Sequence, residues 1–215
     1  MNKTLKRICK ITAISYVLAW IIGLSAGGPS LDLNAKGSSV VSAFTTHRTS
    51  AVVQYLFAEG VAGLLLLILV VTAFRGMKSQ SSKPNTSLKV YGVSGVIASL
   101  ISLTMATIAL ILITHTVSHG TAAQAKTLND LVNRLDGPKM WLLGVMAVSG
   151  VRAYRELPRW LNVTGYALAC SLVVSGIAYG FLIQSLAWAA YVAGILLLVW
   201  VCGFGVTLGS QKNKA

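Results

Sequence analysis

The chain has 215 residues, of which 55% are hydrophobic and only 11% are charged, and its formal net charge is +13. Soluble domains carry about 25% charged residues, so this composition excludes an ordinary soluble domain and indicates a membrane protein. Little chain remains outside the apolar stretches, so we predict one all-α transmembrane bundle over residues 1–215.

Apolar stretches of spanning length recur along the chain. A transmembrane helix needs about 20 mainly apolar residues. The first stretch also resembles a signal peptide, because Ser25, Ala26 and Gly27 follow it, but its length favours an uncleaved helix. The sequence therefore predicts six transmembrane helices, near 11–27, 52–74, 90–114, 138–154, 160–184 and 187–208.

Lysine and arginine gather in the segments that six spans would place on one side of the membrane. By the positive-inside rule this side is cytoplasmic, so we predict a multi-pass protein of the cell membrane with both termini in the cytoplasm. Its expected partners are the bilayer and, on that side, anionic lipid headgroups. Nucleic acid is excluded, since the chain has no separate basic domain. The basic residues are Lys3, Lys6, Arg7, Lys10, Arg75, Lys78, Lys83, Lys89, Arg152, Arg155, Arg159, Lys212 and Lys214.

Residues 115–137 form the longest predicted connection on the opposite side. Leu128, Leu131, Val132 and Leu135 are spaced as on one face of a helix, so we expect a short amphipathic helix at the membrane surface. Gly137 and Pro138 suit the N-cap and first residue of the next span.

Glu59 lies a few residues inside the second apolar stretch. A carboxylate is costly in contact with lipid, so it should face the bundle and be protonated or paired with a cation. Two uses remain open: a packing residue that bonds a neighbouring helix, or a proton or cation site open to the outside.

His115 and His119 are four residues apart, on one face near the outer end of the third span. They either cap the helix end or, with His47 or Glu59, ligate a metal or haem. Two histidines alone are a weak pattern, so we predict no metal and no cofactor. The three cysteines form no CxxC pair, which argues against a redox centre.

Asp136 and Lys139 lie at the start of the fourth predicted span. Asp136 suits a helix N-terminus on electrostatic grounds alone. Alternatively, Asp136 and Lys139 form an outer polar rim with Glu59 and the histidines, which belong to the same half of the molecule.

The stretch "RAYRELPRWLNVTGYALACSLVVSGIAYG", together with "LDGPKM", resembles uncharacterised bacterial six-helix integral membrane proteins, a family of unknown function. The resemblance implies a multi-pass membrane location and carries no catalytic residue across.

Three functional hypotheses follow. The first is a non-enzymatic protein with an outward-facing polar site around Glu59, serving transport of a small substrate or ion, or immunity or resistance to a membrane-active compound. The second is a membrane-embedded enzyme in which Glu59 or Asp136 donates a proton to an isoprenoid or lipid substrate. The third is a structural or sensory subunit.

Overall fold

The computed structural model describes residues 2–78, 85–154 and 156–210, and within these ranges the chain is helical and contains no strand. The all-α class is therefore confirmed. Lys83, Arg155, Lys212 and Lys214 lie outside the described residues, as does most of the connection between residues 78 and 86. The elements are α1 (Lys3–Ser25), α2 (Gly37–Thr46), α3 (Arg48–Tyr55), η1 (Leu56–Val61), α4 (Ala62–Lys78), α5 (Thr86–Ile111), η2 (Leu112–Thr116), α6 (Val117–His119), α7 (Ala122–Ala153), α8 (Arg159–Gly180), η3 (Gln184–Leu186) and α9 (Ala189–Gly209).

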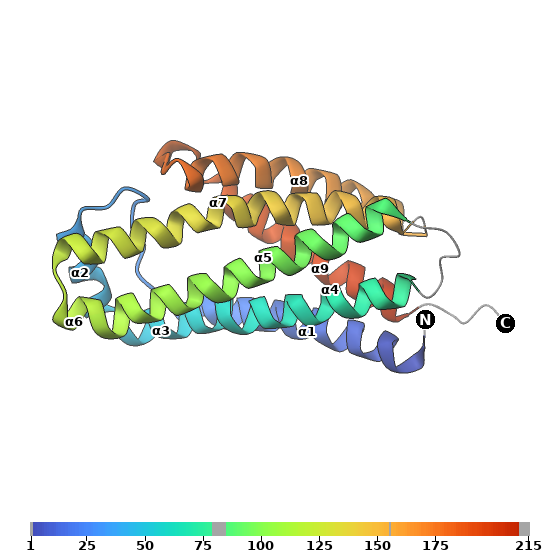
Figure 1. Ribbon diagram of the computed structural model, residues 1–215, viewed down its shortest axis with the longest axis horizontal. Coiled ribbons are helices and arrows are strands. Elements are labelled where there is room, and N and C mark those ends of the chain that lie inside the picture. The colour runs from blue at the N-terminus through green and yellow to red at the C-terminus, as the bar shows by residue number, and fades with distance from the viewer. Residues whose placement is uncertain (1, 79–84, 155, 211–215) are drawn as a thin grey trace.

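The long helices form a closed ring. Passing along the chain, α1 packs against α4, α4 against α5, α5 against α7, α7 against α8 and α8 against α9, and α9 returns to pack against α1 (Figure 1). Successive long helices of the ring run in opposite directions (Figure 1). Both described ends of the chain consequently lie at one end of the bundle.

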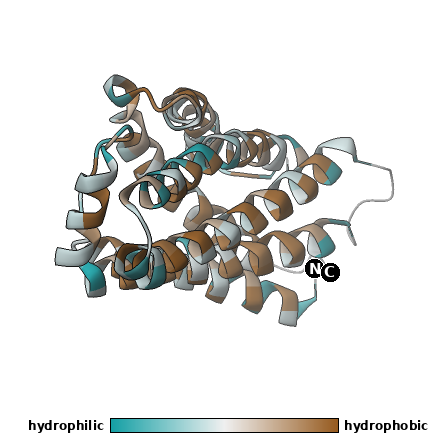
Figure 2. Ribbon diagram, turned by 60° about the vertical axis from the view of Figure 1, so that its left-hand side comes forward, coloured by the Kyte–Doolittle hydropathy of each residue, from teal (hydrophilic) through white to brown (hydrophobic). Residues whose placement is uncertain are grey.

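Large apolar side chains face outward along the bundle, which is the pattern of a lipid-facing surface. On α1, for example, Ile11, Leu18 and Ile21 are each 52% exposed. Hydrophobic residues follow the length of the long helices, and hydrophilic residues lie mostly toward their ends (Figure 2). The protein is therefore a helical membrane protein.

Five helices in the described part of the chain are long and apolar enough to span a membrane, and α7 is not among them. α7 carries Asp130, Arg134 and Asp136 in the half nearer its N-terminus and Lys139 just past its middle, which lowers its hydropathy. A count of six spans stays a prediction. The five are Lys3–Ser25, Arg48–Lys78, Thr86–His119, Arg159–Gly180 and Ala189–Gly209.

The predicted break before the fourth span is wrong, because α7 runs without interruption from Ala122 to Ala153. Its N-terminus is fixed by a capping box, in which the Gln124 backbone N–H donates to Thr121 Oγ1 and the Thr121 backbone N–H donates to Gln124 Oε1. Pro138 lies inside the helix. Since proline has no N–H, the carbonyl of Arg134 loses its usual intrahelical donor there. The predicted amphipathic helix and the predicted fourth span are therefore parts of one continuous helix, α7.

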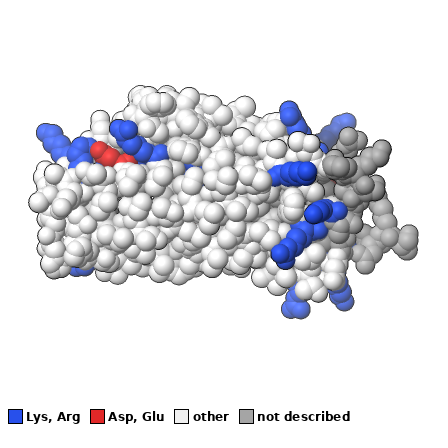
Figure 3. Space-filling model, in the orientation of Figure 1, with Lys and Arg blue, Asp and Glu red and all other residues white. Residues whose placement is uncertain are grey.

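The two ends of the bundle differ in charge. The end where α1 begins and α9 ends, here the basic end, shows lysine and arginine (Figure 3). The opposite end, here the cavity end, shows acids as well, and a band without charge separates the two on the face drawn.

At the basic end the interior is filled by Tyr91, Trp200 and Phe204, which are almost completely buried. At the cavity end α2, α3, α6 and the start of α7 enclose a second small core around Val40 and Phe44.

Candidate functional site

Glu59 occupies a π-helical segment, η1, between α3 and α4. A π-helical turn inserts an extra residue into the helix, changes the direction of the side chains around it, and is frequent at functional sites. The Glu59 residue is only 9% exposed and belongs to the interior of the ring rather than to its lipid-facing surface. The π-helical irregularity thus lies at the position of Glu59, which is the one acidic residue between Arg48 and Lys78.

Glu59 pairs with Lys139 of α7. Lys139 Nζ lies 2.8 Å from Glu59 Oε1 and 2.9 Å from Glu59 Oε2, and donates to both. Ser102 of α5 donates its hydroxyl to Glu59 Oε2. Lys139 is 6% exposed, so the pair is buried. A buried ion pair is sustained only when its remaining donors and acceptors are also engaged, and Ser102 supplies one of these contacts.

Asp136 completes the cluster. Its Oδ1 lies 2.6 Å from Lys139 Nζ, so two carboxylates face one ammonium. Asp136 Oδ1 is buried and has no hydrogen bond of suitable geometry among the described residues. With all three groups ionised the cluster carries one net negative charge. We refer to Glu59, Asp136 and Lys139 as the acid–lysine cluster.

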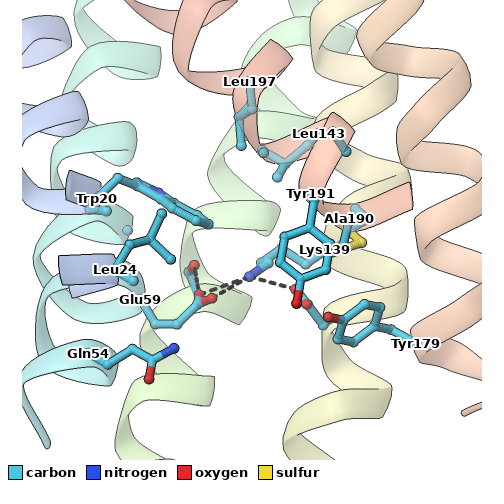
Figure 4. Close-up of a pocket in the computed structure, with 18 of the residues that line it drawn as sticks. Trp20, Leu24, Gln54, Glu59, Lys139, Leu143, Tyr179, Ala190, Tyr191 and Leu197 are labelled. Carbon is cyan, nitrogen blue, oxygen red and sulfur yellow. Dashed lines mark hydrogen bonds and ion pairs between the residues drawn. The ribbon is translucent and has the colours of Figure 1, made fainter. Parts of the chain in front are cut away.

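Close contact between α7 and α8 brings Tyr179 of α8 beside the acid–lysine cluster. A Cβ on Gly137 would lie 2.8 Å from the backbone of Gly176 and of Gly180, so only glycine permits this approach. Tyr179, next to Gly180, lines the interior beside the cluster. Figure 4 shows Glu59 and Lys139 pointing toward each other, with Trp20 on one side and Tyr179 on the other.

Two adjoining cavities surround the cluster. The larger has a volume of about 390 Å³ and is lined by residues of all the long helices in the ring; the smaller has about 240 Å³ and extends toward the cavity end. Glu59, Asp136 and Tyr179 line both. Most of the remaining wall of the larger cavity is apolar, and Leu66, Leu143 and Leu197 line it where it approaches the aromatic core of the basic end. Volume and lining are those of a small-molecule site.

The segment 28–33, here the strap, connects α1 to the region of α2 and lies along both cavities through Pro29 and Leu31. Two side chains hold its end. The Leu33 backbone N–H donates to Gln184 Oε1 at 2.7 Å, and Asn133 Nδ2 donates to the Leu33 carbonyl at 3.3 Å. The strap thereby links η3 and α7 across the cavity end.

The three histidines are not part of this site. His47, His115 and His119 line neither cavity. The rings of His115 and His119 stack at 5.2 Å on an exposed surface, and His47 is the exposed C-cap of α2. Among the described residues, no group of three or more His, Cys, Asp or Glu side chains is placed to hold a metal ion. Of the predicted rim, the structure brings Glu59, Asp136 and Lys139 together and places the three histidines outside both cavities.

Several lining residues escaped the sequence analysis. Tyr16 and Trp20 are four residues apart on α1 and so share one face, a signal that was available. Ser102 gave no signal, because a serine in an apolar helix is common. Asn129 lines the smaller cavity, is buried, and has an Nδ2 without a hydrogen-bond partner among the described residues.

The ring of apolar helices and the enclosed charged cluster define a helical membrane protein with an internal polar site. No protein-family model, curated protein or solved structure matches the chain. The resemblance to bacterial six-helix proteins therefore stays a prediction.

Proposed function

We propose that the protein binds and transports a small cationic substrate, for which the acid–lysine cluster is the binding site. The observation that carries this proposal is the excess of one carboxylate over ammonium beside a cavity inside the bundle. A buried negative charge has lost its solvation by water. Binding of a cation compensates this loss and is therefore favourable. Tyr16, Trp20 and Tyr179 add aromatic faces, which attract alkylammonium groups.

The direction of access follows from the packing and the charge distribution. The interior of the basic end is filled, whereas the cavities lie toward the opposite end. Under the positive-inside rule the basic end is cytoplasmic, with both termini inside and contacts to anionic headgroups of the cell membrane. The substrate would then enter from the outer side, as in uptake by a transporter or in capture of an external toxic cation by a resistance protein.

Binding of tetramethylammonium to the purified protein in lipid nanodiscs, followed by uptake into proteoliposomes, tests the proposal. We expect wild type to bind and accumulate the ion, and Glu59→Gln to weaken binding about tenfold or more, because the cluster then loses its excess charge. Asp130→Asn is the matched control, since Asp130 lies on α7 but lines neither cavity. Absence of binding in wild type, or equal binding in Glu59→Gln, would contradict the proposal.

An enzyme that uses Glu59 or Asp136 as acid on an isoprenoid or lipid is the second candidate. The aromatic lining favours it, since a carbocation is stabilised by such rings. However, both oxygens of Glu59 already accept hydrogen bonds, so this acid is not free to donate a proton. Product formation from an isoprenoid substrate, absent in Asp136→Asn, would establish the enzyme instead.

A further inference from the structure

One side of the larger cavity opens between α1 and α9. Leu24 near the end of α1 is 56% exposed and Tyr191 near the start of α9 is 75% exposed, yet both line this cavity. A residue that lines a cavity and is also exposed on the outer surface marks an opening. Because α1 and α9 are neighbours in the ring, this opening faces the lipid.

Packing along the two helices gives independent evidence for the opening. Near the basic end α1 and α9 are in close contact: a Cβ on Gly205 would collide with the side chain of Ala13, and one on Gly209 would lie 2.7 Å from the carbonyl oxygen of Lys6. At Gly194, near the other end of α9, a Cβ would meet no atom within 4 Å. Figure 1 shows α1 and α9 meeting near the chain termini and diverging from there. The two helices form a wedge, bounded by Leu24, Tyr191 and Gly194.

The wedge and the cluster differ in chemistry. The wedge is lined by apolar groups of Leu24, Ala190 and Ala193, and by Gly194, which adds no side chain. The acid–lysine cluster lies farther in, between Trp20 and Tyr179 (Figure 4). A molecule that fills both must have a charged group at one end and a hydrocarbon chain at the other.

Building on the proposed function, we infer that the substrate is a single-chain cationic amphiphile that enters sideways from the lipid through the wedge between α1 and α9. Its ammonium group lies against Asp136 and Glu59, and its chain lies between Leu24 and Tyr191 with its end in the bilayer. Charge complementarity selects the headgroup, because two carboxylates face one ammonium in the cluster. The chain never leaves apolar surroundings, so entry costs little desolvation.

Photolabelling tests the route. The probe is an alkyltrimethylammonium ion with a diazirine in the middle of a twelve-carbon chain, where the chain passes through the wedge, added to the protein in phosphatidylcholine nanodiscs. We expect labelled peptides to come from α1 and α9 around Leu24 and Tyr191, with labelling suppressed by excess tetramethylammonium and lost in Glu59→Gln. Labelling spread evenly over the lipid-facing helices, or equal labelling at the wedge by a maltoside of the same chain length, would overturn the inference.

A variant that fills the wedge separates this inference from the proposed function. Gly194→Trp adds a side chain where a Cβ would meet no atom within 4 Å, so we expect the variant to fold. We expect it to weaken binding of dodecyltrimethylammonium about tenfold by excluding chain methylenes, and to leave tetramethylammonium binding unchanged. Ile195→Trp is the control, since Ile195 is 66% exposed and does not line the cavity.

The outcomes are distinct. Equal binding of both ions by Gly194→Trp and wild type would overturn the lateral route and leave the cation site intact. An equal loss for both ions would also overturn it, because the tryptophan would then act at the headgroup position. A wild-type protein that binds neither ion would remove the proposed function itself.

Discussion

The basic half and the cavity half of the bundle are built from the same helices but filled in opposite ways. In the basic half Trp200 stacks on Phe204 with ring centroids 4.8 Å apart, and Phe204 meets Tyr91 at 5.5 Å. In the cavity half the corresponding space holds charges and open volume. Packing of large rings stabilises a fold, whereas a charged cavity costs stability and is retained where it binds something. The difference separates the half whose packing stabilises the fold from the half that contains the proposed binding site.

The largest expected effect is on the aromatic core. Trp200→Ala removes an almost fully buried side chain that fits against Gly150 and Gly165, and should lower the free energy of unfolding by about 4 kcal/mol. Tetramethylammonium binding should be unchanged at temperatures where the variant is folded, since Trp200 lines neither cavity. Thermal unfolding in detergent micelles measures the first effect. Trp188→Ala, at a residue that is 61% exposed, is the control and should cost far less.

Removal of the central cation should have the next largest effect. Lys139→Met leaves Glu59 and Asp136 buried without their counter-ion, so we expect a loss of about 3 kcal/mol of stability. The double variant Lys139→Met with Glu59→Gln should recover part of this loss, because one uncompensated charge is gone. Unfolding curves of the single and double variants provide the comparison. A Lys139→Met protein as stable as wild type would show that the cluster is not charged as drawn.

The smallest effect concerns the hydrogen bond from Ser102. Ser102→Ala removes a donor to Glu59 Oε2 and should cost about 1 kcal/mol of stability and weaken cation binding severalfold. Ser99 lies three residues earlier on α5 and donates instead to the Gly95 carbonyl of its own helix. Ser99→Ala should therefore leave cation binding unchanged. Equal binding by the two variants would mean that Ser102 does not orient Glu59 for a ligand.

The sequence predicted the helical class well, because membrane helices must satisfy their backbone hydrogen bonds locally and their apolar residues must face lipid. It also required that Glu59 avoid lipid. The identity of its partner was beyond the sequence, since Lys139 is 80 residues away and the pairing depends on how the ring closes. The π-helical turn that holds Glu59 has no simple pattern in the residues.

The misplaced start of the fourth span shows how two local signals compete. Gly137 and Pro138 resemble a helix N-terminus. The actual N-terminus is the capping box of Thr121 and Gln124, which is a less conspicuous pattern in the sequence. The proline is tolerated within α7 despite the donor it removes, and Gly137 serves contact with α8 instead of capping a helix. The histidines were grouped with the acids only by their shared end of the molecule, which does not determine which way a side chain faces.

The proline inside α7 has a mechanical consequence. Asp136 precedes Pro138 in the helix, and Lys139 follows it. The helical turn that ends at Pro138 lacks the hydrogen bond that would stiffen it. The N-terminal part of α7 packs against α2, while the C-terminal part is held in the ring. Pro138 is thus the position at which α7 bends most easily. A force on the N-terminal part of α7 would bend the helix at Pro138 and change the distance between the Asp136 carboxylate and the Lys139 ammonium, and with it the electrostatic potential in the cavity.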